Sequence, residues 1–268
     1  MLRSKPVPVL PLLTIVLLAA CSTVPLTGRQ QLDLVSSDQI MAMSAQEYEQ
    51  VKKEHKVITN TADARMVKQV GKRISSAVER YLASQNQSQL LAGYAWEFSL
   101  IKDDSANAWA MPGGKVAVYT GILPITKDDN GLATVMGHEV AHAVARHGNE
   151  RMSQGLLTQM GGAALSVALS QNPSQTSDLF MAAYGLGAQV GVLLPFSRLQ
   201  ESEADRLGLI FMAMAGYDPR EALDFWQRMS EASQGGAPPE FLSTHPAHET
   251  RIQRIRDYLP EAMSYYRK

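Results

Sequence analysis

The stretch that decides the fold reads Gly137-His138-Glu139-Val140-Ala141-His142, a His-Glu-x-x-His pattern inside the segment 132–148. Residues four apart share one face of a helix, so His138 and His142 can bind a single metal ion. Glu139 lies about 100° round the helix from His138, from where it can reach a water molecule at that metal. Two imidazoles suit zinc when the protein adds a third ligand and leaves a fourth position open. We therefore expect one zinc ion per chain at this helix.

The residues around the motif separate it from a chance match on a surface helix, because they are uncharged: Val135, Met136, Val140, Ala141, Ala143 and Val144. A buried carboxylate without a partner is costly, so a charged pair in such surroundings needs a purpose. Asp128, Asp129 and Asn130 can cap the start of the helix, and Gly148 is expected to end it. His147 lies about 140° round from His142, which predicts a structural or surface histidine and not a ligand.

Composition limits the class of protein. The chain has 268 residues, 45% of them hydrophobic, and a formal net charge of −1. This length allows one large domain or two small ones, and the apolar content is sufficient for a core. The balanced charge gives no indication of a nucleic acid as partner.

The first twenty residues have the features of a bacterial export signal. Arg3 and Lys5 supply positive charge, and residues 6–20 form an uncharged, mostly apolar run that is short for a membrane span. The sequence Leu18-Ala19-Ala20-Cys21 resembles a lipobox, in which Cys21 is lipidated; the alternative is an ordinary signal peptide followed by a free thiol. Cys21 is the only cysteine, so it has no disulfide partner within the chain. We predict a lipoprotein signal peptide at 1–20, a tether with little structure at 21–36, and one domain over 37–268.

Hydrophobic periodicity predicts an α+β fold that is mainly helical. Apolar residues at helical spacing predict helices over 37–55, capped by Ser37 or Asp38, over 62–84, and over 247–259 at the end. Between them the period changes to two, which predicts strands over 96–100, 106–111 and 115–120. We therefore expect a zincin fold with a small three-stranded sheet, whose exposed edge strand lies beside the metal-binding helix.

The predicted strand over 106–111 could bind an extended substrate. An exposed edge strand adds a peptide as a further strand and holds it by main-chain hydrogen bonds. We predict substrate contacts from Asn107, Ala108 and Trp109. The alternative is a strand that only packs the core.

An acidic cluster later in the chain can supply the third metal ligand. Glu201 and Asp205 share one face of a predicted helix, whereas Glu203 lies about 200° away from Glu201. One carboxylate can bind the metal while another orients a liganding imidazole. We predict Glu201 as the ligand, Asp205 as the orienting group, and Glu203 as a solvated or salt-bridged charge. The alternative is an acidic helix start that the helix dipole favours.

Two apolar runs, 156–169 and 179–196, lie between the second and third predicted ligands. Glycines dilute the second run and Pro195 ends it, so we predict two buried or plug-like helices instead of a membrane-spanning hairpin. Such a segment could also rest on a lipid surface or cover the active-site cleft.

These motifs together resemble the HtpX/CAAX-prenyl-protease family of gluzincin zinc metallopeptidases. The resemblance covers about residues 62–259 and rests on His138-Glu139-x-x-His142, Glu201-x-x-Ala204-Asp205, His245-Pro246 before Arg251-Ile252, Asn107-Ala108, Pro112-Gly113-Gly114 and Gly216-Tyr217-Asp218-Pro219. With the lipobox, the likeness is to the periplasmic lipoprotein branch that contains LoiP and the BepA protease domain, related to the mitochondrial inner-membrane quality-control protease.

The resemblance implies a zinc endopeptidase of the bacterial cell envelope that hydrolyses damaged or misassembled envelope proteins. Glu139 and Asp205 would serve catalysis together with His245, which would stabilise the oxyanion or occupy the fourth zinc position at rest. A loop histidine fixed by Pro246 is the alternative for His245. A palmitoylated Cys21, followed by Ser22, would anchor the chain to the outer membrane, facing the periplasm, with other envelope proteins as partners. The rival class is a non-proteolytic lipoprotein chaperone or assembly factor that uses the same cleft.

Overall fold

The computed structural model describes residues 21–24, 27–160, 173–184, 197–233, 239–246 and 249–267. The predicted signal peptide and much of the two apolar runs lie outside these residues. Within the described ranges, the structure contains no helix that combines the length and the apolar character needed to cross a membrane. Helices dominate and two small sheets accompany them, which confirms the predicted α+β class.

The main sheet has four strands in the order β3-β4-β6-β5. Their bounds are β3 (Val57–Ile58), β4 (Glu97–Ile101), β5 (Ala108–Met111) and β6 (Lys115–Tyr119). Strand β6 pairs parallel to β4 and antiparallel to β5. Gly113 and Gly114 make the turn between β5 and β6 at φ values of +79° and +81°, which side chains other than glycine rarely adopt. The sequence predicted three of these strands; β3 has two residues, too few to show an alternating pattern.

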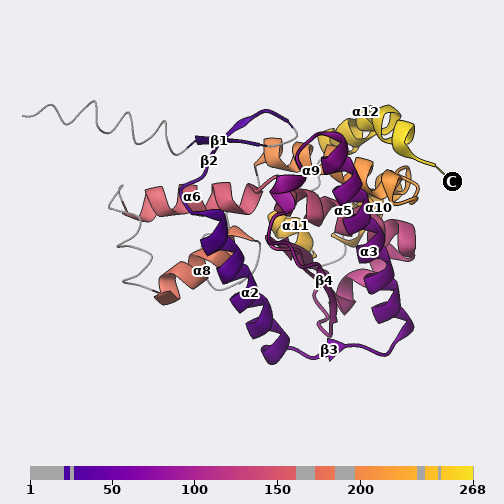
Figure 1. The fold of residues 1–268 in the computed structure, drawn as a ribbon. Helices are drawn as coiled ribbons and strands as arrows, with labels where there is room; N and C mark the ends of the chain where they lie inside the picture. The colour runs from indigo at the N-terminus through magenta and orange to yellow at the C-terminus, as the bar shows by residue number, and fades with distance from the viewer. Residues whose placement is uncertain are drawn as a thin grey trace, which may run out of the picture.

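Helices cover both faces of this sheet, as Figure 1 shows. One face belongs to a first hydrophobic cluster with α3 (Ala62–Ser84), α5 (Asp129–Val144) and α9 (Arg198–Met214). The other belongs to a second hydrophobic cluster with α2 (Ser37–Glu54), α6 (His147–Met160) and α8 (Pro173–Ala183). Successive strand residues alternate between the two layers, so Ala108 and Ala110 face α5 while Trp109 and Met111 face away from it. The sheet is therefore the middle layer of three.

Strand β5 forms one edge of the sheet and packs against α5, as predicted, but its side chains are not exposed. Ala108, Trp109, Ala110 and Met111 are all at most 5% exposed. The reason is that helices lie over both faces of the strand.

Several predicted helix boundaries hold and others do not. Helix α3 spans the predicted residues, and Asp128 caps α5 by accepting hydrogen bonds from the backbone N–H groups of Asn130 and Gly131. Helix α2 is capped by Ser36, in a capping box with Gln39, instead of by Ser37 or Asp38.

The predicted end of the metal-binding helix at Gly148 is wrong. Helix α5 ends at Val144, and Arg146 turns the chain in the left-handed region at φ +63°. A new helix, α6, therefore begins at His147, and the angular argument that assumed one continuous helix does not apply to this residue.

The remaining helices complete the layer around α5. They are α4 (Leu123–Thr126), α10 (Glu221–Ala232), α11 (Glu240–Thr244) and α12 (Glu249–Tyr265), with the short 3-10 helices η1 (Ser88–Leu91) and η2 (Thr120–Ile122). Helix α12 continues past the predicted end at residue 259 and contains Pro260.

The described part of the segment predicted as a tether with little structure, residues 21–24 and 27–36, is folded onto the domain. Strands β1 (Cys21–Thr23) and β2 (Gln30–Leu32) pair antiparallel. Val24 and Val35 are buried in the two hydrophobic clusters, and Asp33 makes an ion pair of 2.9 Å with Arg146. The segment has apolar and charged side chains that match the surface of the domain, so its low helical or strand periodicity did not mean that it lacks structure.

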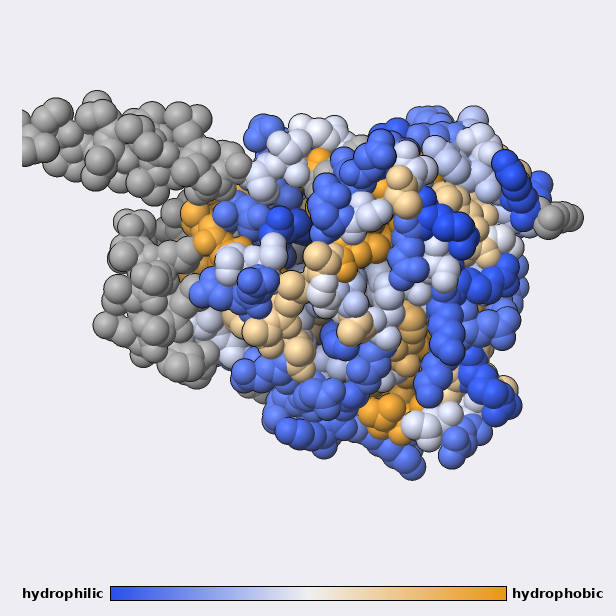
Figure 2. All heavy atoms as spheres, viewed as in Figure 1, coloured by the Kyte–Doolittle hydropathy of each residue, from blue (hydrophilic) through white to orange (hydrophobic). Residues whose placement is uncertain are grey.

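The described surface is mostly hydrophilic on the face drawn in Figure 2, where apolar atoms show only in small patches between elements. Among the described residues, the one large hydrophobic side chain classed as exposed is Leu199, at 54%. Most large hydrophobic side chains of the described residues are therefore buried in the two hydrophobic clusters beside the sheet.

Candidate metal centre

Two glycines bring helices α5 and α9 into backbone contact. A Cβ atom at Gly137 would lie 2.9 Å from the carbonyl oxygen of Gly208, and a Cβ at Gly208 would lie 2.9 Å from the backbone nitrogen of His138. No side chain fits between the helices at this point. The crossing places Glu201, seven residues before Gly208, beside the two motif histidines.

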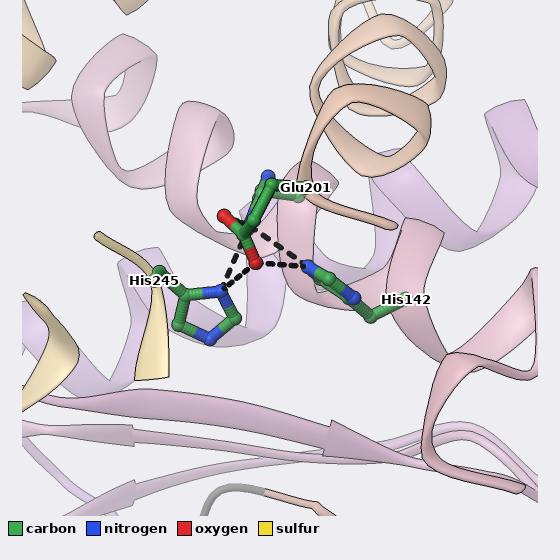
Figure 3. A group of neighbouring side chains, drawn as sticks. His142, Glu201 and His245 are labelled. Atoms are coloured by element: carbon green, nitrogen blue, oxygen red, sulfur yellow. Dashed lines mark hydrogen bonds and ion pairs between the residues drawn. The ribbon is translucent and has the colours of Figure 1, made fainter. Parts of the chain in front are cut away.

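Four buried side chains converge at this crossing: His138, His142, Glu201 and His245, whose candidate ligand atoms all lie within 4.8 Å of one another. The Nε2 atoms of His138 and His142 are 3.0 Å apart, and Nε2 of His142 is 3.3 Å from Oε1 of Glu201. His245 approaches the same carboxylate oxygen from the other side, with its Nδ1 at 2.9 Å (Figure 3). The structure thus brings together the three predicted ligands and His245.

The spacing of these donors fits zinc. Bonds of about 2.0–2.1 Å in a tetrahedral arrangement put ligand atoms about 3.3 Å apart. The separations of 3.0, 3.3 and 2.9 Å lie close to that value. Two or three imidazole nitrogens with one carboxylate oxygen are also the donor types that zinc prefers.

Charge in the site favours a cation as well. Burial opposes protonation of His138, but hydrogen bonds to Asp205 and Glu201 outweigh burial and raise the pKa of His138 to about 9. Burial likewise opposes ionisation of Glu201, yet Arg251 and the neighbouring histidines hold its pKa well below the usual range. The buried carboxylates therefore attract positive charge, which a divalent metal ion would supply.

Asp205 lies where the sequence placed it, with Oδ1 3.0 Å from Nδ1 of His138. That contact is on the ring nitrogen away from the other ligands, so Asp205 can fix the orientation of this imidazole. Arg251 was not predicted as a site residue. Its guanidinium lies 2.7 Å from both Glu201 and Asp205 and 3.4 Å from the ring centroid of Trp226. The sequence feature that could have indicated Arg251 was the motif His245-Pro246 before Arg251-Ile252.

Glu139 is 3% exposed and lies beside the ligand cluster. Its Oε1 finds no hydrogen-bond partner among the described residues, and its nearest ion-pair neighbour is Nε2 of His245 at 3.4 Å. Burial raises the pKa of Glu139 to about 8, because the positive charge of His138 and Arg251 offsets burial only in part. Buried polar atoms nearly always have a partner, so this oxygen marks a place for a water or ligand.

A second set of buried polar residues lies behind His142, and the sequence did not reveal it. His147 is fully buried, with Nδ1 2.9 Å from Nδ1 of His142 and Nε2 3.1 Å from Oε2 of Glu203. Glu203 is also hydrogen-bonded by Arg29 and Thr27, so it is a salt-bridged charge, one of the two predicted options. The missing signal was the break between α5 and α6, which turns His147 back toward His142.

The three predicted substrate residues lie on the edge strand or just before it. Asn107 accepts a hydrogen bond from the N–H of Ala108 at 2.8 Å, and its own Nδ2 is buried without a partner among the described residues. Trp109 was expected to contact substrate, but its side chain faces the opposite layer, 5.8 Å from the ring of Tyr48. Strand alternation sends it there, so only its backbone remains available on the α5 side.

A His-Glu-x-x-His helix completed by a glutamate from a second helix defines a zinc metallopeptidase site of the gluzincin type. Comparison with known families agrees with this class. The model of Peptidase family M48 matches residues 68–259, more than half of the chain, and the chain belongs to this family. It is a metalloendopeptidase by family, and zinc is the cofactor that family members use.

Similar proteins are named as metalloendopeptidases or as a protease. The chain is 36% identical to the mitochondrial metalloendopeptidase OMA1 of Schizosaccharomyces pombe over 244 residues, 89% of this chain and 66% of the relative. It is 32% identical to human OMA1 over 245 residues, 89% of this chain and 46% of the relative. The beta-barrel assembly-enhancing protease of Escherichia coli is 30% identical over 166 residues, 60% of this chain and 34% of the relative. The chain thus spans about one third to two thirds of the length of these relatives.

Proposed function

We propose that this chain is a zinc-dependent endopeptidase of the bacterial cell envelope that cleaves damaged or misassembled envelope proteins. The observation that carries the hydrolytic part is Glu139, a buried carboxylate with an unpartnered oxygen beside four candidate zinc ligands. The similarity to a beta-barrel assembly-enhancing protease and the export signal in residues 1–20 support the envelope assignment.

The residues of the site divide the chemistry between them. His138, His142 and Glu201 would hold zinc, which supplies a Lewis acid that lowers the pKa of a water molecule. Glu139 would take a proton from the attacking water and pass it to the leaving amine, a task that suits a carboxylate buried beside the candidate zinc ligands. Asp205 holds the imidazole of His138 in the orientation that ligation requires.

His245 has two roles that fit its position. Its ring nitrogens lie 2.9 Å from Glu201 and 3.4 Å from Glu139, so it can complete the metal site at rest or donate to an oxyanion during cleavage. It belongs to the turn after α11, and the backbone N–H of Phe241 in that helix donates to the carbonyl of Ala106. This bond ties the segment that carries His245 to the residues just before the edge strand.

The substrate would bind along β5 as an additional strand. Ala108 faces α5, and Nδ2 of Asn107, which has no hydrogen-bond partner among the described residues, would donate to a substrate carbonyl. Main-chain pairing reads little of the substrate sequence, which suits unfolded or misassembled proteins as substrates. Lipidation of Cys21 would hold the chain at the outer membrane, facing the periplasm.

The test compares wild type, Glu139→Gln and a control, Glu231→Gln, which changes an exposed carboxylate on α10. Cleavage of unfolded casein is measured, together with the zinc content of each protein. We expect Glu139→Gln to lose activity by about 10²- to 10⁴-fold while it keeps one zinc, and Glu231→Gln to match wild type. A chelator should abolish cleavage by the wild type.

The chaperone hypothesis makes the opposite prediction. A non-proteolytic holding protein would suppress casein aggregation without cleavage, and both the chelator and Glu139→Gln would leave that effect intact. Wild-type proteolysis by Glu139→Gln would show that the proposed mechanism is wrong.

A further inference from the structure

We infer that His147, Glu203 and Arg29 form a hydrogen-bonded relay that positions His142 for zinc, and that the segment preceding α2 is therefore part of the metal-binding unit. The inference deepens the proposed function and rests on the assignment of His142 as a ligand. It assigns positioning roles to residues outside the ligand cluster.

The relay is continuous from the metal centre to the N-terminal segment. Nδ1 of His142 meets Nδ1 of His147 at 2.9 Å, and Nε2 of His147 meets Oε2 of Glu203 at 3.1 Å. Arg29 donates from Nε to the same oxygen at 2.9 Å, while Thr27 donates to Oε1. Both oxygens of Glu203 are thus engaged, and its position is fixed from two sides.

The order of protons along this relay follows from hydrogen-bond logic. A ring nitrogen that binds metal needs a lone pair, so ligation through Nε2 leaves the proton of His142 on Nδ1. That N–H must donate to His147, whose Nδ1 therefore carries a lone pair. The proton of His147 then lies on Nε2, where it donates to Glu203. If Glu203 were absent, His147 could hold its proton on Nδ1 and drive His142 into the tautomer that cannot bind.

The relay matches the arrangement on the other liganding histidine. Nδ1 of His138 lies 3.0 Å from Oδ1 of Asp205, so a carboxylate fixes that ring directly. At His142 the carboxylate of Glu203 acts through the imidazole of His147, the first residue of α6, which lies between the two side chains. Both imidazoles thus have a hydrogen-bond acceptor at Nδ1, as metal-liganding histidines generally do.

Arg29 joins α6 and α9, the helices that carry His147 and Glu203. Its Nη atoms make a bidentate pair with Glu150 of α6, both at 2.8 Å, while its Nε reaches Glu203 of α9. Gln200, directly before Glu201, donates to the same Glu150 at 2.7 Å. The planar guanidinium serves both carboxylates at once, which a lysine could not do.

The experiment measures zinc affinity by competition with a chromophoric chelator and the visible absorption of the Co²⁺-substituted protein. Variants are Glu203→Gln, in which one carboxylate oxygen becomes an NH₂ donor and the negative charge that faces His147 and Arg29 is lost, and Arg29→Met. The matched control is Arg228→Met, which removes another largely buried guanidinium, 17% exposed against 18% for Arg29, paired with Glu221 on α10.

We expect Glu203→Gln to weaken zinc binding by about 10- to 100-fold and to change the Co²⁺ spectrum. Arg29→Met should also weaken zinc binding and change the Co²⁺ spectrum, but less than Glu203→Gln does. Arg228→Met should leave the zinc affinity and the spectrum as in wild type. Arg29→Met decides the matter if Glu203→Gln does not fold. Wild-type zinc affinity and an unchanged Co²⁺ spectrum in the folded variants would overturn the relay. Because these readings need no substrate, a wild type that binds zinc but cleaves no casein contradicts the proposed function alone.

Discussion

Replacing Gly208 by alanine tests whether the crossing of α5 and α9 builds the metal centre. The new Cβ would lie 2.9 Å from the backbone nitrogen of His138 and 3.0 Å from the carbonyl carbon of Gly137. Comfortable contacts with carbon are about 3.5–4.0 Å, so the helices must separate by roughly 0.5–1 Å. Both neighbours are backbone atoms, and no side chain can rotate away to relieve the contact.

Two opposing effects set the change in the free energy of unfolding of Gly208→Ala. Overpacking of this kind costs about 1–3 kcal/mol, while alanine gains about 0.8–1.0 kcal/mol over glycine in helix propensity. The net loss in the free energy of unfolding is about 0–2 kcal/mol, or a fall of up to roughly 8 °C in the unfolding midpoint for a domain of this size. Zinc sites tolerate changes in ligand distance of only about 0.2 Å, so zinc affinity should fall by about tenfold or more.

The assay is thermal unfolding with and without excess zinc, alongside chelator competition. Zinc stabilises the folded chain in proportion to its affinity, so the gap between the two midpoints should narrow in Gly208→Ala. Gly155→Ala on α6 is the control, because its Cβ would meet only the flexible side chain of Leu179, with Cδ1 the nearest atom at 2.6 Å, and no backbone. Wild-type midpoints and zinc affinity in Gly208→Ala would refute the reasoning.

Three further substitutions test the charges of the site. Glu201→Ala should abolish stoichiometric zinc in metal analysis, whereas Glu203→Ala should retain zinc with lower affinity; the reverse result would exchange their roles. Arg251→Met should lower the free energy of unfolding in urea by about 3–5 kcal/mol in the zinc-free protein, because it leaves Glu201 and Asp205 buried without their cation. An unfolding curve that matches wild type would show that Arg251 does not balance these charges.

Local spacing was enough to predict the centre of the site. His138 and His142 lie on one helical face because the helix repeats every 3.6 residues, whatever the rest of the chain does. The same periodicity placed Glu201 and Asp205 on a common face of α9 and predicted the bounds of α3. Each of these features depends on residues within a few turns of one another.

Contacts between segments far apart in the sequence could not be predicted from residue spacing, because they depend on how the helices and the sheet pack. The layer into which the side chain of Trp109 points depends on which helices cover the sheet, so residue spacing did not predict that it packs away from α5. The substrate contact of this residue stays a prediction. The docking of Arg29 on Glu150 and Glu203 joins residues more than a hundred positions apart, which no periodic pattern encodes.

The sequence by itself determined the metal-binding helix, its predicted ion and the choice of Glu201 over Glu203. The reason is that the helical repeat fixes which nearby residues point to the same face of a helix. Only the tertiary structure decided what surrounds them. The left-handed turn at Arg146 redirects His147 toward His142, and two glycines let α9 approach α5 closely enough to bring its carboxylate to the histidines. Both outcomes depend on where the chain turns and how closely its helices pack, and neither is visible in residue spacing.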